Sequence, residues 1–86
     1  MLYSDEIDET KLAEVALAIL SLSATREKYG SRVWKSMDWD LMQLLFENDW
    51  ISNPVGKQKS VVLTEQGEEL AALFLKKHFT KSPAND

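Results

Sequence analysis

The residues of this chain that could take part in chemistry are few. The 86-residue sequence contains one histidine, His78, and no cysteine. Without cysteine there is no disulfide framework, no thiolate metal site and no cysteine nucleophile. His78 stands in the last turn of an expected helix, where a histidine packs and complements the helix dipole, and nothing nearby in the sequence completes a usual set of metal ligands.

Carboxylates are the next candidates for acid–base or metal chemistry. Asp38 and Asp40 are two residues apart, but they also stand where a helix is expected to begin, which makes them an N-cap and a first-turn acid. The acidic run 5–9 could hold a hard cation only weakly, because it lacks the glycine and the spacing of a calcium loop. We interpret this run as a solvated segment that precedes the first helix.

One pair of residues is similar to the end of a phosphate-binding loop. Gly56-Lys57 has the right order, but Gln58 stands where serine or threonine is required, and Ile51 stands where the first glycine belongs. We reject the match. The sequence therefore predicts no catalytic residue, no metal ligand and no cofactor, and we expect that the protein is not an enzyme.

Length and composition predict one small globular domain. The chain has a mass of 9.8 kDa, with 44% hydrophobic and 28% charged residues, which are globular values. Ten basic and fourteen acidic side chains give a net charge of −4, the wrong sign for a nucleic-acid-binding protein unless the bases are segregated. The start of the chain is acidic, unlike a signal peptide, and the apolar run 15–20 is far shorter than the roughly 20 residues that span a bilayer. We expect a soluble, cytoplasmic protein.

The first expected helix covers about residues 10–23. Its apolar residues repeat at steps of three and four: Leu12, Val15, Ala16, Ile19 and Leu20. Only a narrow stripe is polar or small: Lys11, Glu14, Ala18 and Ser21. A helix that is apolar around most of its circumference must be covered on most sides. In so short a chain, this requires either a central position or a second subunit.

The rest of the chain predicts two more helices and a hairpin. Residues 24–36 are interpreted as a connection in which Arg32-Val33-Trp34 is a short extended piece. The second helix follows Asp38 and ends near Asn48-Asp49, which tolerate a left-handed cap, with Trp50 folding back on Leu45. A hairpin with strands at 51–52 and 59–63 encloses a turn at 53–56. Thr64 caps the last helix.

The expected fold is mainly α with a two-stranded β-hairpin, a winged-helix-like small single domain. Residues 1–9 form an acidic leader, residues 10–79 the domain and residues 80–86 a flexible tail. We expect the core to contain Leu12, Val15, Ile19, Met42, Leu45, Phe46, Val62, Leu70 and Phe74. Two of the three tryptophans are also expected to pack there, because a domain of this size needs bulky core residues.

Two resemblances support this fold. The run 44–51 looks like the end of a recognition helix that enters a wing strand, and Leu63-Thr64-Glu65-Gln66-Gly67 is similar to the helix after the wing in multiple-antibiotic-resistance-type repressors. A wider set of blocks resembles a family of small bacterial proteins of unknown function: Trp34-Lys35, Asp38-Trp39-Asp40, Asn53-Pro54-Val55-Gly56-Lys57, Lys59-Ser60-Val61-Val62-Leu63-Thr64-Glu65 and Gly67. This family implies a small α-helical domain with a wing-like hairpin and no known activity. It usually has glycine where Asp49 stands, and aspartate there costs on the order of 1 kcal/mol for a positive φ.

Basic residues gather in two places and are candidates for nucleic-acid contacts. They are Arg26, Lys28, Arg32 and Lys35 in the segment 26–35, and Lys57 and Lys59 on the expected wing. The expected recognition helix 39–48 argues against groove reading, because it carries Asp40 and Glu47 and no lysine or arginine. Nucleic acid is therefore a candidate partner that we do not favour over a solvated charged face.

Apolar and aromatic residues are the candidates for a protein interface. We select Leu12 and Leu17 on the first helix, and Trp34 and Trp39 beside the second, because exposed tryptophans anchor interfaces. We favour a non-catalytic interaction module that self-associates as a dimer or binds a protein partner. We expect that it binds neither a membrane nor a small-molecule substrate. The alternative is a small winged-helix DNA-binding transcriptional regulator that uses the wing and the segment 26–35.

Overall fold

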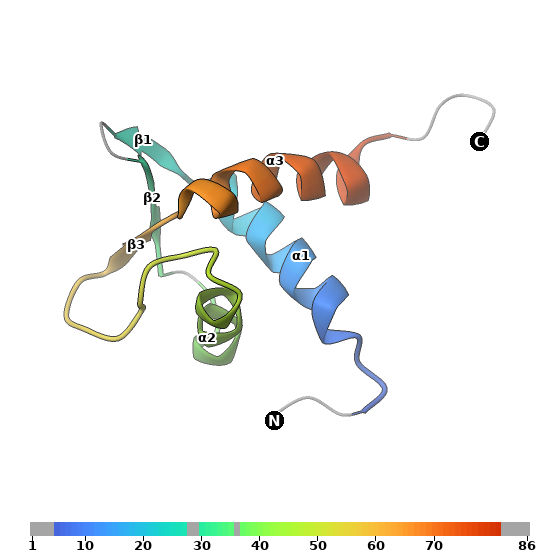
Figure 1. Cartoon of the computed structure of the whole chain (residues 1–86), viewed down its shortest axis with the longest axis horizontal. Coiled ribbons are helices and arrows are strands. Elements are labelled where there is room, and N and C mark those ends of the chain that lie inside the picture. The colour runs from blue at the N-terminus through green and yellow to red at the C-terminus, as the bar shows by residue number, and fades with distance from the viewer. Residues whose placement is uncertain (1–4, 28–29, 36, 82–86) are drawn as a thin grey trace.

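The computed structural model describes residues 5–27, 30–35 and 37–81. In chain order its elements are α1 (Glu9–Ser21), β1 (Thr25–Glu27), β2 (Gly30–Trp34), α2 (Trp39–Glu47), β3 (Ser60–Val62) and α3 (Glu65–Phe79). The strands gather on one side of the molecule, while α3 crosses over α1 on the other (Figure 1). The three expected helices are thus present, and α1 begins at Glu9 after the N-cap Asp8, whose side chain accepts a hydrogen bond from the Lys11 amide (3.1 Å).

The sheet has three antiparallel strands in the order β1-β2-β3, so the expected two-stranded hairpin is wrong. Segment 24–36, interpreted as a connection, supplies two of the strands: Thr25 pairs with Arg32, and Arg32 with Val62. The expected hairpin partner of β3 is reduced to one bridge between Ile51 and Leu63, flanked by a 2.8 Å hydrogen bond from the Ser52 amide to the Val62 carbonyl.

The third strand was not predicted because the alternation of buried and exposed residues along β2 is short and flanked by charged residues. In β2, Ser31 and Val33 are buried, whereas Arg32 is half-buried and Trp34 is exposed. This is the period of two that a half-buried strand requires. Because only five residues show it, the pattern identified the extended piece 32–34 but did not reveal its partners.

The end of α2 confirms the expected left-handed cap. Asp49 has φ 65°, and its amide donates to the Phe46 carbonyl (2.9 Å). The Trp50 amide donates to the Leu45 carbonyl (3.1 Å), so the chain folds back over the helix as predicted. These two bonds form a Schellman motif, which satisfies carbonyls that the helix end would otherwise leave unpaired.

Thr64, at the start of α3, connects this helix to the turn that ends α2. The Thr64 hydroxyl accepts from the Gly67 amide (2.9 Å), as an N-cap does, and donates to the Asp49 carbonyl (2.7 Å). The Thr64 amide also donates to the Trp50 carbonyl (3.0 Å). One threonine therefore caps α3 and ties it to the end of α2.

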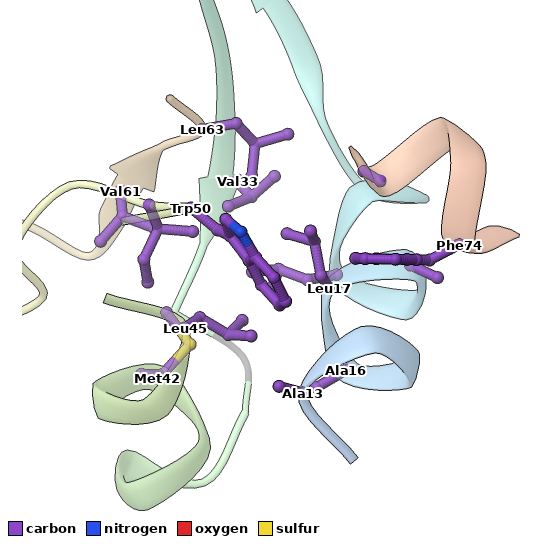
Figure 2. Packing of buried hydrophobic residues seen from close by; sticks show 14 residues of the cluster. Ala13, Ala16, Leu17, Val33, Met42, Leu45, Trp50, Val61, Leu63 and Phe74 are labelled. Carbon is purple, nitrogen blue, oxygen red and sulfur yellow. The ribbon is translucent and has the colours of Figure 1, made fainter. Parts of the chain in front are cut away.

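The core lies between α1, α2, α3 and the inner face of the sheet (Figure 2). Trp50 is at its centre, with its ring centroid 5.4 Å from that of Phe74. The buried hydrophobic residues are Ala13, Ala16, Leu17, Ala18, Leu20, Val33, Met42, Leu45, Trp50, Ile51, Val61, Leu63, Ala71 and Phe74. Met42, Leu45 and Phe74 are thus core residues as expected.

Two expectations about the core are wrong. Ile19 is 46% exposed, and Leu12, Val15 and Val62 are only half-buried. Phe46 and Leu70 are also half-buried, but they pack against the core cluster. Of the three tryptophans only Trp50 is buried, since Trp34 and Trp39 are 61% and 51% exposed. For Ile19 the reason is the orientation of α1, which buries the side with Ala13, Ala16 and Leu17, whose alanines allow close packing of neighbouring elements.

Candidate functional site

The outer face of α1 carries an apolar stripe. Leu12, Val15 and Ile19 of α1 and its C-cap residue Leu22, whose backbone is still helical, follow one another at steps of three, four and three residues, which aligns them on one side. Ile19 is 46% and Leu22 68% exposed, while Leu12 and Val15 are half-buried. We call these four residues the outer stripe. It lies opposite the buried Leu17, so neither the core nor α3 covers its exposed part.

The polar side of α1 is turned toward α3. Glu14 accepts a hydrogen bond from the Lys77 ammonium (3.0 Å), and its Oε1 lies 2.8 Å from His78 Nε2. The side chains of Glu14 and His78 are largely buried, at 14% and 12% exposed. Glu14 would otherwise interrupt the apolar surface of α1, but these contacts hold it between the helices.

The Glu14 cluster joins α1 to α3 and, with Asp8, Thr10 and Lys11, lines a surface hollow. Hydrogen bonds from His78 and from Lys77 hold the pKa of Glu14 below its ordinary value of 4.5. The His78 ring also lies beside Phe74 and Phe79, with centroids 6.5 and 6.4 Å apart. The Glu14 carboxylate is therefore occupied by its two partners and joins the middle of α1 to the end of α3.

The other carboxylates that were considered for chemistry act at helix starts. Asp38 accepts a hydrogen bond from the Asp40 amide (3.0 Å) as the N-cap of α2, and Asp40 lies in the first turn. Asp8 plays the same part for α1. In the described ranges, no three histidine, cysteine, aspartate or glutamate side chains gather in a way that could hold a metal ion.

The structure separates the four predicted interface residues. Leu17 is fully buried, so its selection as an interface residue is wrong, because it lies on the core side of α1. Leu12 is a half-buried member of the outer stripe. Trp34 and Trp39 are exposed, at the end of β2 and at the start of α2. Leu22 was not selected as an interface residue, although its spacing from Ile19 places it in the same apolar arc.

The structure brings three of the six predicted nucleic-acid residues together and separates the two arginines from each other. Lys35, Lys57 and Lys59 come together, since the Lys35 amide donates to the Lys59 carbonyl (2.8 Å) and the Lys35 ammonium donates to the Gly56 carbonyl (3.3 Å). Arg32 lies on the outer face of the sheet and pairs with Glu27 (3.1 Å). Arg26 pairs with Ser31, whereas Arg32 pairs with Thr25. Arg26 lines a hollow together with Ser31 and Glu68. Lys28 lies outside the described residues.

One polar contact behind the sheet was not anticipated. The Ser31 hydroxyl donates to the Glu68 carboxylate, which joins β2 to α3. Ser31 is the one buried polar residue of the described chain, and its alternation with Val33 is the signal that could have placed it inward. This bond fixes the sheet against α3 and leaves the opposite face of β2 outward.

Within the described residues, no helix has the length and apolar character needed to cross a membrane. The longest helix, α3, has 15 residues and carries lysines in its last turn.

The fold and its surfaces define a small mixed α/β domain with an exposed apolar helix face. The model of the family "Domain of unknown function (DUF6429)" matches residues 8–81, and the chain belongs to this family. It is 37% identical over 76 residues to "Uncharacterized protein y4hR" of Sinorhizobium fredii (strain NBRC 101917 / NGR234), a match that covers 88% of this chain and 99% of the relative. No solved structure matches the chain significantly. The resemblance to a family of small bacterial proteins is thereby confirmed.

Proposed function

We propose that this protein is a non-catalytic interaction module that self-associates by packing the outer stripe of α1 against the same stripe of a second copy. The observation that supports this proposal is the exposure of Ile19 and Leu22 on a helix whose charged Glu14 is turned inward. Exposed apolar side chains that form a continuous row on a soluble domain mark an interaction surface.

The spacing of the outer stripe suits a second helix of the same kind. Steps that alternate between three and four residues follow the heptad pattern, in which two helices pack side by side with interlocking side chains. A two-fold axis can pair the stripe with itself, because an isologous interface uses one patch twice. The stripe is only about 15 Å long, so we expect a dissociation constant on the order of 10 micromolar.

Charge favours an antiparallel arrangement of the two copies. Asp5 and Glu9 lie at the start of α1, whereas Arg26 follows its end. When two α1 helices cross in opposite directions, the acidic start of one copy approaches Arg26 of the other. This complementarity favours a second copy over an unrelated apolar partner, since opposite charges select orientation and partner.

The test is the mass in solution of the wild type and of Ile19→Glu. Burial of an isoleucine contributes roughly 1.5 kcal/mol or more, and a two-fold interface contains it twice, so we expect dimerisation to weaken by at least about 100-fold. Sedimentation velocity over a concentration series measures this. Leu73→Glu is the matched control, because Leu73 is equally exposed (55%) on α3, outside the outer stripe.

Two outcomes contradict self-association through α1. A wild type that stays at 9.8 kDa up to about 1 millimolar excludes the homodimer, since no affinity useful in a cell would remain. A dimer that Leu73→Glu disrupts and Ile19→Glu leaves intact places the interface elsewhere. Circular dichroism of both variants verifies that each is folded, so that loss of the dimer is not loss of structure.

The alternative function, a winged-helix DNA-binding regulator, has weaker support. A winged-helix-like arrangement, with residues 51–63 as the wing, remains a proposal for the fold. In that arrangement α2 would enter the major groove, but its charged residues are Asp40 and Glu47, which phosphates repel. The proposal that α2 reads a DNA duplex therefore has less support than the proposal of self-association.

A further inference from the structure

The charge of the chain is divided between the sheet and the helices. The two segments 25–35 and 50–64, which supply the strands and their loop, contain six bases and one acid. The rest of the chain contains four bases and thirteen acids. The net charge of −4 thus combines a basic sheet region with acidic helices, and a region of one sign attracts a partner of the opposite sign regardless of the total.

Trp34 projects from the outer face of this basic sheet. It is the last residue of β2, is 61% exposed and pairs across the sheet with Ser60. Arg32, two residues earlier, shares this face, since side chains alternate along a strand. Its Nη1 donates to the Ser60 hydroxyl (3.1 Å) and its Nε to Glu27, so the guanidinium extends across the sheet toward the strand that pairs with Trp34.

Three lysines lie at the end of the sheet where Trp34 lies. Lys35 and Lys59 stand opposite each other one position beyond the pair of Trp34 and Ser60, so by the same alternation their side chains start on the other side of the sheet from Trp34. Lys35 follows Trp34 directly and pairs through its amide with Lys59. The ammonium group of Lys35 donates to the carbonyl of Gly56, next to Lys57. Within the part of the chain that the structure describes, none of these lysines forms a salt bridge. We call this end of the sheet, with Arg32, Trp34, Lys35, Lys57 and Lys59, the basic sheet face.

We propose that the basic sheet face binds single-stranded nucleic acid, with one base stacked on Trp34 and the phosphates held by Lys35, Lys57 and Lys59. An exposed aromatic ring beside a row of cations is the arrangement that binds single strands without reading sequence. Stacking favours a nucleic acid over an acidic peptide, because every base presents a flat π-face to the indole, whereas glutamate and aspartate do not. This inference is independent of self-association through the outer stripe.

A single strand also suits the surroundings better than a duplex. The start of α2, with Asp38 and Asp40, follows the basic sheet face after only two residues. These acids would repel the second backbone of a wide duplex. A single strand can follow β2 and β3 away from them, because its backbone is flexible and only one chain of phosphates must be neutralised.

Trp39 provides a matched control on the same protein. It is 51% exposed, close to the value for Trp34, but it lies between Asp38 and Asp40. If an exposed indole alone were sufficient for binding, both tryptophans would contribute. If the cations are required, as the proposal states, only Trp34 contributes.

The experiment is the anisotropy of a labelled oligothymidylate of about 12 nucleotides, a length within the usual site size. We expect Trp34→Ala to weaken binding by at least about fivefold, since one stacked base contributes that much, while Trp34→Phe retains most of the affinity and Trp39→Ala leaves it unchanged. With three phosphates neutralised, log affinity should fall with log salt at a slope of about −2, and of about −0.7 in the double variant Lys57→Ala, Lys59→Ala.

Several results would overturn this proposal. The first is no binding by the wild type at about 50 mM salt, where such contacts are strong. Equal losses in Trp34→Ala and Trp39→Ala would show that the cations do not select the site. Tighter binding of a matched duplex would favour a double-stranded partner, and full competition by polyglutamate would favour an acidic peptide. Ile19→Glu should bind the oligonucleotide like the wild type, which separates this result from the fate of the dimer.

Discussion

Gly67 lies directly against the main chain of Trp50: a methyl group on Gly67 would stand 2.0 Å from the Trp50 carbonyl oxygen. That carbonyl accepts the hydrogen bond of the Thr64 amide and belongs to the turn that ends α2. The contact therefore joins the first turn of α3 to the central residue of the core. It also explains why glycine occupies a helical position, where it is normally unfavourable.

Gly67→Ala should destabilise the protein, although alanine is the better helix former. The methyl group cannot fit against main-chain atoms, so α3 must shift, at a cost of about 1–3 kcal/mol. Urea unfolding followed by circular dichroism measures this cost. The neighbouring, exposed Gln66→Ala should change the free energy of unfolding by less than about 0.5 kcal/mol. Equal stability of Gly67→Ala and the wild type would contradict the close contact.

Asp49→Gly should stabilise the protein by about 0.5–1 kcal/mol. Asp49 has φ 65°, and glycine adopts this conformation without the steric cost that a side chain imposes. Asp49→Ala should lower stability instead, because alanine lacks the local hydrogen bonds that help aspartate tolerate it. Thermal unfolding of the three proteins gives the order. A variant Asp49→Gly less stable than the wild type would show that the aspartate side chain has a further role.

The bond of Glu14 to His78 should make stability depend on pH on the acid side. The pKa of Glu14 is below its ordinary value of 4.5 in the folded protein, so the contribution of this carboxylate is complete above pH 4.5 and is lost as the pH falls through the lower, folded pKa. Glu14→Gln should remove that part of the dependence. The two unfolding free energies should therefore converge as the solution becomes more acidic, and parallel curves would contradict the assignment.

The two sides of α1 should respond differently to truncation. Leu17→Ala should cost about 2–5 kcal/mol, because Leu17 is fully buried and a cavity would remain. Ile19→Ala should change the stability of the monomer by less than about 1 kcal/mol, since Ile19 is half exposed. Unfolding in urea at a concentration where the protein is monomeric measures both. A larger loss at Ile19 than at Leu17 would mean that α1 is rotated relative to this structure.

Residue types along the chain were sufficient to predict where the helices begin and end. Asp38, Thr64 and Asp49 each act by contacts with residues close in the sequence, so the residue type determines the cap. The short runs of residues that resemble the family were sufficient to identify it. Both kinds of inference depend on short-range patterns, which remain readable when the tertiary structure is unknown.

The rotation of α1 and the third strand could not be predicted in the same way. Leu17 and Ile19 are equally apolar, and only the approach of α3 and the sheet determines which of them is buried. Likewise, Val33 pairs with Val61 across 28 positions, and nothing in the five residues of β2 identifies that partner. Of the outer stripe, Leu12 was selected for an interface, whereas Val15 and Ile19 were expected only in the core.

The edge strand β1 limits how copies of this domain can associate. It has three residues, all exposed, and two of them are the charged Arg26 and Glu27. Short, charged edges resist the addition of a further strand, which is the route to open-ended, fibre-like growth. The proposed two-fold pairing through side chains of α1 would instead close on itself, so we expect this protein to form small assemblies even at high concentration.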